Sequence, residues 1–208
     1  MTGKLLLVAG GTGGHIWPAI SFGRWIGINK PEISVSYICG NRPLELEIYT
    51  SAGIEPRQLK IDGSPLAGGG LEKLRRIWGQ FPAFVDSAAL IRSEDPDFVL
   101  LFGGYVSFPV LLASRMLRKP AAVHEQNAYA GKVTRMASGM GVDVFSGWRE
   151  CIPIQASRYT RIGVPVRDFA IMSPEKAWTE LGLPGKLPEG PKPLVFSGTL
   201  GTSSIKYL

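Results

Sequence analysis

The chain has 208 residues, of which 45% are hydrophobic and 19% are charged, a composition that excludes an intrinsically disordered protein. The formal net charge of +6 and a pI near 9.4 favour an anionic partner, such as a nucleotide, a phosphate, an anionic lipid or nucleic acid. Cys39 and Cys151 are the two cysteines, too few for a disulfide framework and without metal-binding CxxC spacing, so we expect a reducing, cytoplasmic compartment. Leu5–Ala9 is too short for a signal-peptide core, and no apolar run has the length of a transmembrane helix.

Apolar runs, glycine turns and helical patterns alternate along most of the chain. The expected strands are Lys4–Ala9, Ser34–Cys39, Arg57–Ile61, Phe98–Phe102, Ala121–Glu125, Val142–Phe145 and a short one near Arg161–Ile162. The expected helices are Trp17–Ile28, Leu44–Ser51, Leu71–Arg92 with a kink or break at Pro82, Ser107–Leu117 and Gly131–Ser138. This alternation predicts an α/β fold with a doubly wound, parallel, Rossmann-like sheet, in which ligands bind beyond the carboxyl ends of the strands.

The last part of the chain predicts the beginning of a second α/β unit. Ser173 followed by Pro174 indicates a helix start, and Leu194–Phe196 is an apolar strand that leads into the turn Ser197–Thr202. An isolated strand cannot bury both faces, so we expect the chain to be a piece of a longer protein. The expected domains are residues 1–163 and a connector plus an incomplete second domain over residues 164–208.

The turn Gly10–His15 follows the first strand and precedes a helix. Glycines let the backbone approach a ligand closely, and the positive end of the helix dipole favours an anion. The spacing is neither GxGxxG nor a P-loop, which disfavours NAD binding and ATP hydrolysis. His15 at a helix start is expected to be neutral, and it could act as a general base or bind a phosphate. The alternatives are tight strand–helix packing for the glycines and a capping or packing role for His15.

Two further polar or glycine-rich segments follow strands at the same edge of the predicted sheet. The turn Gly103–Ser107 could donate backbone N–H groups to a diphosphate, with Ser107 as the N-cap of the next helix. The run His124–Asn127 places four polar residues where a cleft is expected, although a buried polar network that supports the loops is the alternative. His124 and Glu125 lack metal-ligand spacing, so we expect no metal site.

The segment Leu71–Phe84 mixes large apolar residues with basic ones. Such a segment suits an anionic membrane surface, although the face of an ordinary amphipathic helix has the same pattern. The candidate membrane contacts are Leu71, Trp78 and Phe81, with Lys73, Arg75 and Arg76 as their basic neighbours.

Together, the three segments Gly10–His15, Gly103–Ser107 and His124–Asn127 resemble the MurG family of GT-B glycosyltransferases in order and spacing. The resemblance covers about residues 4–168 and implies the N-terminal, acceptor-side half of such an enzyme. The family transfers N-acetylglucosamine from UDP-N-acetylglucosamine to the undecaprenyl-diphosphate-linked acceptor lipid I, which gives lipid II for peptidoglycan. The implied protein is peripheral, on the cytoplasmic face of the bacterial inner membrane.

The resemblance also implies roles for individual residues. His15 matches a position that assists catalysis, and Asn127 and Arg167 match contacts to the nucleotide sugar. Thr199 matches a serine that contacts the donor. The substrate-binding positions implied around the cleft are Thr12, Gly13, Gly14, Gly103, Gly104, Tyr105, Ser107 and Glu125.

The implied reaction is an inverting transfer that needs no metal and no cofactor. The expected partners are UDP-N-acetylglucosamine, lipid I and an anionic membrane surface, and no nucleic-acid recognition motif is present. The sequence departs from the family pattern at Phe108, Val164, Ser197, Thr199 and Leu200, mainly where the donor would bind. There are two alternatives. One is a module that binds the acceptor and works with a separate donor subunit, and the other is a GT-B enzyme with another acceptor.

Overall fold

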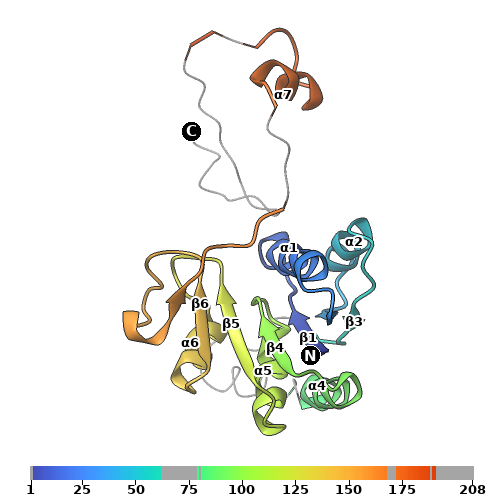
Figure 1. Ribbon diagram of the computed structural model, residues 1–208, viewed down its shortest axis with the longest axis vertical. Coiled ribbons are helices and arrows are strands. Elements are labelled where there is room, and N and C mark those ends of the chain that lie inside the picture. The colour runs from blue at the N-terminus through green and yellow to red at the C-terminus, as the bar shows by residue number, and fades with distance from the viewer. Residues whose placement is uncertain (1, 62–78, 80, 168–171, 188, 191–208) are drawn as a thin grey trace. The chain divides into compact units, whose positions relative to one another are not determined.

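The computed structural model describes residues 2–61, 79, 81–167, 172–187 and 189–190 (Figure 1). The chain divides into two compact units, Met1–Val166 and Arg167–Leu208. Of the expected features, the loop at 62–70, the helical segment at 71–78, and the strand and glycine turn at 194–202 lie outside the described residues.

The first unit contains a seven-stranded parallel sheet in the order β3-β2-β1-β4-β5-β6-β7 (Figure 1). The strands are β1 (Gly3–Val8), β2 (Ile33–Cys39), β3 (Arg57–Gln58), β4 (Phe98–Leu101), β5 (Ala121–Glu125), β6 (Asp143–Ser146) and β7 (Thr160–Arg161). The predicted fold class, a doubly wound parallel α/β sheet, is confirmed.

The strand order reverses beside β1. Leu7 of β1 pairs with Tyr37 of β2 on one side and with Leu100 of β4 on the other. Since the chain continues in opposite directions from this point, the loops that follow β1 and β4 diverge, and ligands in such sheets bind between them. The turns at Gly10 and Gly103 therefore flank the switch point of the sheet.

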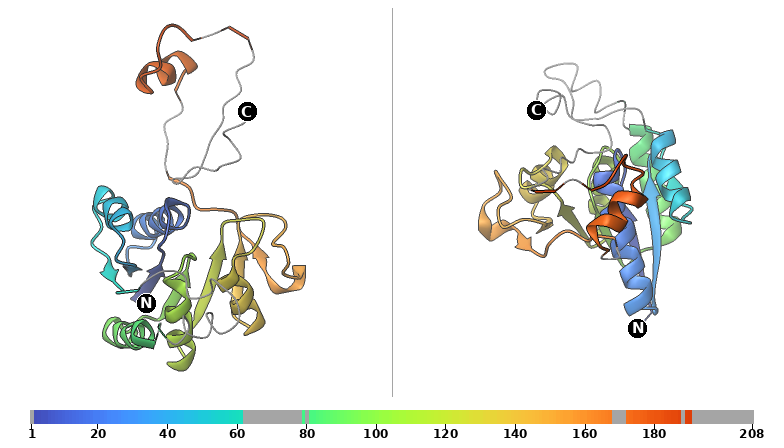
Figure 2. Two further views of the ribbon diagram at one scale, coloured as in Figure 1. Left: turned by 180° about the vertical axis from the view of Figure 1, so that it is seen from behind. Right: turned by 90° about the horizontal axis from the view of Figure 1, so that it is seen from above.

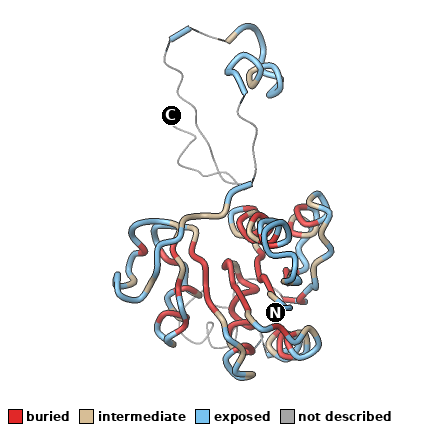
Figure 3. The backbone as a smooth tube through the Cα atoms, in the orientation of Figure 1, coloured by how far each residue is buried: buried red, intermediate tan, exposed pale blue. Residues whose placement is uncertain are grey.

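Helices cover both faces of the sheet (Figure 2). They are α1 (Gly13–Asn29), α2 (Pro43–Ser51), α4 (Phe81–Glu94), α5 (Ser107–Met116) and α6 (Lys132–Gly139), with a short 3₁₀ helix at Ala156–Arg158. Leu7 packs in one buried cluster with Ile20 of α1, whereas Leu6 packs in another with Val110 of α5. Alternate residues of β1 thus face opposite cores, which is why the central strands are continuous apolar runs and are largely buried (Figure 3).

The helix after β1 begins at Gly13, four residues before the predicted start at Trp17. Thr12 has an extended backbone with φ −141°, and its carbonyl accepts hydrogen bonds from the N–H groups of His15 and Ile16 at 3.1 and 3.2 Å. Gly13, Gly14 and His15 are therefore the first turn of α1, not part of a loop. The N–H groups of Gly13 and Gly14 have no partner within such a helix and point out of its N-terminus.

The prediction that Ser107 caps α5 is wrong. Val106 occupies the N-cap position, and Ser107 is the first helical residue. Its buried hydroxyl donates to the carbonyl of Gly103 at 2.7 Å, four residues back, so it stabilises the turn before the helix. Ser173, by contrast, caps helix α7 (Pro174–Glu180) as predicted, because its hydroxyl accepts from the backbone N–H of Lys176 at 3.3 Å.

Helix α7 is the element of the second unit that the structure describes. Within the described ranges of both units, no helix is both long enough and apolar enough to cross a bilayer.

Candidate functional site

The turns after β1 and β4 are packed directly against each other. Gly11, Gly103 and Gly104 have φ values of +94°, +97° and +81°, which L side chains rarely adopt. A Cβ atom on Gly104 would collide with the backbone of Gly10, and one on Gly103 would lie 2.9 Å from Nδ1 of His15. The glycines are therefore required for the close approach of the two turns and for the position of the His15 ring.

Glu45 fixes the turn after β1 through hydrogen bonds, a role that no sequence pattern indicated. Its fully buried carboxylate accepts from the N–H of Gly11 at 2.9 Å and from the N–H of Gly40, after β2, at 2.7 Å. Glu45 lies in the first turn of α2, where an acid is expected only for its effect on the helix dipole. The signal available in the sequence was an acid after Pro43, which does not indicate burial.

Tyr105 connects Glu45 to the surface of the site. Burial, and then the neighbouring Glu45 carboxylate, raise the pKa of Tyr105 well above its usual value, so its hydroxyl stays protonated. The guanidinium carbon of Arg42 lies 4.3 Å from the centroid of the Tyr105 ring, a distance suited to a cation–π contact. The buried ring therefore positions an exposed cation beside the glycine turns.

His15, Arg42 and Tyr105 line a cavity of about 320 Å³ at the carboxyl edge of the sheet, here called the switch-point cavity. It is lined by His15, Arg42, Gly103, Gly104, Tyr105, Glu125, Asn127, Gly131, Lys132, Val133 and Thr134. Six predicted site residues thus lie together, contributed by the ends of β1, β4 and β5. Arg42 and Lys132 add two cationic side chains that the sequence analysis did not select.

The carboxylate of Glu125 accepts hydrogen bonds from the loop that follows it and from α6. Its Oε1 accepts from the backbone N–H and the side-chain amide of Asn127, both at 3.0 Å. Its Oε2 accepts from the N–H of Gly131 at 2.8 Å and from the hydroxyl of Thr134 at 2.6 Å. Four hydrogen bonds to one buried carboxylate agree with the alternative of a polar network that supports the loop. Glu125 thereby fixes Asn127 and the start of α6 at the wall of the cavity.

His15 is connected to β5 through Gln126. Nδ1 of His15 lies 2.9 Å from Oε1 of Gln126, and Nε2 of Gln126 lies 3.0 Å from Nδ1 of His124. Nε2 of His124 lies in turn 2.8 Å from the carbonyl oxygen of Gly163. Burial lowers the pKa of His124 below its usual value of 6.5, so its ring is neutral at pH 7.

The other predicted site residues that the structure describes do not line this cavity. Thr12 is the N-cap of α1, Gly13 is buried, and Gly14 is exposed in the first turn. Arg167 is an exposed residue of the second unit. Phe81 is 57% exposed at the start of α4. The predicted residues that lie outside the described ranges are Thr199, Leu71, Lys73, Arg75, Arg76 and Trp78.

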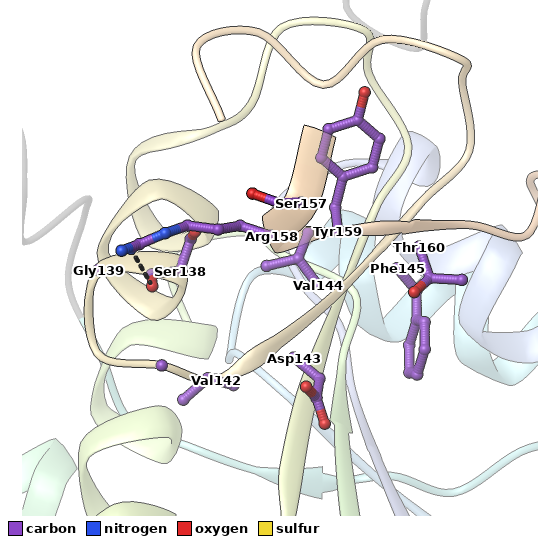
Figure 4. Close-up of a pocket in the computed structure, with 11 residues that line it drawn as sticks. Ser138, Gly139, Val142, Asp143, Val144, Phe145, Ser157, Arg158, Tyr159 and Thr160 are labelled. Carbon is purple, nitrogen blue, oxygen red and sulfur yellow. Dashed lines mark hydrogen bonds between the residues drawn. The ribbon is translucent and has the colours of Figure 1, made fainter. Parts of the chain in front are cut away.

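A second cavity, of about 530 Å³, lies beside β6, β7 and the 3₁₀ helix (Figure 4). Arg158 spans it and donates to the carbonyl of Ser138 at 3.4 Å, and Asp143 lines it at the first residue of β6. It thus extends to the amino-terminal end of β6, away from the edge where ligands bind in doubly wound sheets. The smaller switch-point cavity, with its histidine and glycine turns, is therefore the candidate functional site.

Comparison with known proteins shows the family of the first unit. Residues 5–146 match the model of the glycosyltransferase family 28 N-terminal domain. The chain belongs to glycosyltransferase family 28. All four candidate segments, which begin at Gly10, Leu71, Gly103 and His124, lie within the matched residues.

Two relatives of this family 28 chain carry the same name. The chain is 37% identical, over 96% of its length, to the UDP-N-acetylglucosamine--N-acetylmuramyl-(pentapeptide) pyrophosphoryl-undecaprenol N-acetylglucosamine transferase of Magnetococcus marinus, of which it covers 53%. The protein of the same name from Chlorobium limicola is 32% identical over 97% of the chain, which covers 56% of it. The crystal structure of Acinetobacter baumannii MurG matches 80% of the chain with a TM-score of 0.63 and 26% identity, and 47% of that structure is covered. The family 28 chain thus spans about half the length of the relatives it matches.

Proposed function

We propose that this chain is the acceptor-binding half of a MurG-type glycosyltransferase. The complete enzyme transfers N-acetylglucosamine from UDP-N-acetylglucosamine to lipid I, the undecaprenyl-diphosphate-linked muramyl-pentapeptide, to make lipid II. The observation that carries the proposal is the switch-point cavity, which brings His15 together with the turn at Gly103 and Gly104 and two cationic side chains in a family 28 domain. The names of the relatives supply the two substrates.

The cavity suits the diphosphate of the acceptor. Arg42 and Lys132 bring positive charge to its wall, and the N-terminus of α1 directs N–H groups of Gly13 and Gly14 outward beside it. Its one carboxylate, Glu125, has its charge distributed over four hydrogen bonds. The formal charge of the whole chain, +6, favours the same anionic ligand.

In the proposed reaction His15 is the catalytic base. The acceptor hydroxyl oxygen forms a bond to the anomeric carbon of N-acetylglucosamine while the bond from that carbon to the β-phosphate oxygen of UDP breaks. The hydroxyl proton passes to His15, and UDP leaves with the electron pair of the broken bond. The anomeric configuration inverts because attack and departure occur on opposite faces of the sugar.

The donor is expected to bind mainly to the part of the enzyme beyond this chain. Within the chain, Asn127 in the first unit and Arg167 and Thr199 in the second are the proposed donor contacts. We place the domain boundary at residue 163, with the connector and the start of the donor domain over residues 164–208. No metal or cofactor enters the proposal.

We also propose that the enzyme is peripheral on the cytoplasmic face of the bacterial cell membrane. Phe81 and Val85 lie one turn apart on α4 and are 57% and 47% exposed, so this helix presents two large apolar side chains to its surroundings. Leu71, Lys73, Arg75, Arg76 and Trp78 would continue this contact with the anionic membrane surface.

A transfer assay with the full-length protein tests the proposal. We expect His15→Ala to lower kcat for transfer of labelled N-acetylglucosamine to lipid I by about 10²- to 10⁴-fold, the usual contribution of a general base, with little change in KM. Gln58→Ala, an exposed position on β3, is the control and is expected to keep full activity. Unchanged turnover in His15→Ala would refute the catalytic role of His15, and the absence of transfer to lipid I by the unmodified protein would refute the function.

A further inference from the structure

The side-chain amide of Gln126 lies between the two imidazoles of the chain, His15 and His124. Its oxygen can only accept hydrogen bonds, and its nitrogen can only donate them. An imidazole nitrogen can do either, depending on the tautomer of the ring. The arrangement of Gln126 therefore determines which nitrogen of each ring carries the proton.

Two backbone carbonyl groups determine the orientation of the amide. Nε2 of Gln126 lies 3.0 Å from the carbonyl oxygen of His124, which only accepts, so the NH₂ group must be on that side. Nε2 of His124 lies 2.8 Å from the carbonyl oxygen of Gly163, so that ring nitrogen must carry a proton. The neutral His124 ring then has a lone pair on Nδ1, which requires the NH₂ group at the same place. Both constraints give one orientation of Gln126.

With this orientation, the amide oxygen faces His15. Nδ1 of His15, 2.9 Å from Oε1 of Gln126, must therefore be protonated, which leaves the lone pair of the neutral ring on Nε2. We infer that Gln126 is a positioning residue that fixes the tautomer of His15, so that its Nε2 is always ready to accept a proton. This inference rests on the proposed function for the identity of the proton donor, the acceptor hydroxyl.

The position of Gln126 is itself fixed by its surroundings. The indole N–H of Trp148 donates to the backbone carbonyl of Gln126 at 2.8 Å, and Glu125 holds the next residue, Asn127, from the other side. When Nε2 of His15 takes a proton, Nδ1 remains a donor, so the hydrogen bond to Gln126 persists. The proton transfer thus requires no rearrangement of the amide, which is the form of preorganisation that lowers a barrier.

Nitrogen-15 NMR of the imidazole rings in the whole chain tests the inference directly. The chain has two histidines, so the spectrum contains two rings, and His15→Ala identifies their signals by loss of one set. We expect opposite tautomers at pH 7.5, with His15 protonated at Nδ1 and His124 at Nε2. Because burial lowers the pKa of His124, its ring should be protonated to a smaller extent than a free imidazole at pH 6.5.

The variant Gln126→Met keeps the length of the side chain and removes its hydrogen bonds to both histidines. We expect the His15 signals of this variant to move toward an average of the two tautomers, whereas Gln58→Met, the same change at an exposed position on β3, should leave them unchanged. A His15 ring protonated at Nε2 in the unmodified chain would overturn the inference even if the variant failed to fold. An unchanged His15 tautomer in a folded Gln126→Met chain would also overturn it.

Kinetics of the full-length enzyme separate this inference from the proposed function. We expect Gln126→Met to lower kcat by roughly 10- to 100-fold with unchanged KM, as for other small errors in the placement of a catalytic group. Full kcat in Gln126→Met would overturn the inference. If His15→Ala keeps full turnover while the tautomers are as stated, the proposed catalytic role of His15 fails and the assignment of the tautomers stands; if the unmodified enzyme does not transfer to lipid I, the proposed function fails and that assignment again stands.

Discussion

Single polar side chains that are buried or partly buried give the site its shape. Glu125 lines the cavity and Glu45 and Gln126 do not, yet all three hold the backbone or the rings around it. Such groups are retained when every donor and acceptor finds a partner, because an unpaired group in a buried place is costly.

Glu45 offers the sharpest test at this scale. In Glu45→Gln the new NH₂ group must face one of the two N–H donors, of Gly11 or Gly40, that the carboxylate now satisfies. We expect the free energy of unfolding, measured by urea denaturation, to fall by about 2 kcal/mol because a hydrogen bond to a charged group is lost and a buried donor is left unpaired. Glu47→Gln, an exposed position on the same helix, should change it by less than about 0.5 kcal/mol. Equal stabilities of the two variants would show that the carboxylate does not hold the turn.

At the scale of the elements, the close contact between the turns after β1 and β4 is the feature that forms the cavity. Gly104 has φ +81° and lies against the backbone of Gly10, whereas Gly53, after α2, has φ +71° and a Cβ atom added there would meet no atom within 4 Å. A side chain at either glycine would therefore strain the backbone, but only a side chain at Gly104 would also collide with a neighbouring turn.

Replacing each of these glycines by alanine separates the two effects. We expect Gly53→Ala to lower the free energy of unfolding by about 1–2 kcal/mol, the cost of a left-handed backbone for an L residue. Gly104→Ala should cost at least about 3 kcal/mol, because the methyl group also forces the two turns apart. Thermal and urea denaturation of both variants measure the difference, and similar losses would mean that the turns can separate without cost.

Most of the sheet could be predicted because strands such as Lys4–Ala9 and Phe98–Phe102 are mainly apolar runs that are followed by glycine. The start of α1 could not be predicted, because the helical pattern of side chains begins at Trp17 whereas the helical backbone begins directly after Thr12. Ser107 suits an N-cap and an i−4 bond equally well, so only the backbone decides between them.

The predicted cluster of site residues depended on the rule that carboxyl ends of parallel strands share an edge, and His15, Gly103 and Glu125 do line one cavity. The contacts within that cluster could not be predicted. His15 and Gln126 are 111 residues apart in the sequence, and nothing in the run His124–Asn127 indicates which side chain faces the first turn. Arg42 was missed because its place beside Tyr105 depends on the packing of two separate loops.

For the whole molecule, the structure describes the unit that contains the switch-point cavity and one helix of a second unit. The chain covers 53% of its Magnetococcus marinus relative, and in the proposed function the donor binds mainly to the rest of the enzyme. His124 donates from Nε2 to the carbonyl oxygen of Gly163, the residue at which we propose the domain boundary.

The central claim is that the switch-point cavity binds the diphosphate of the acceptor. Chemical shifts of the backbone amides of the chain, recorded with a soluble lipid I that has a shortened polyprenyl chain, test it most directly. We predict shift changes at His15, Gly103, Gly104 and Lys132, and none at residues 157–160, which line the second cavity. Changes centred on residues 157–160, or no changes around His15 at saturating lipid I, would contradict the account.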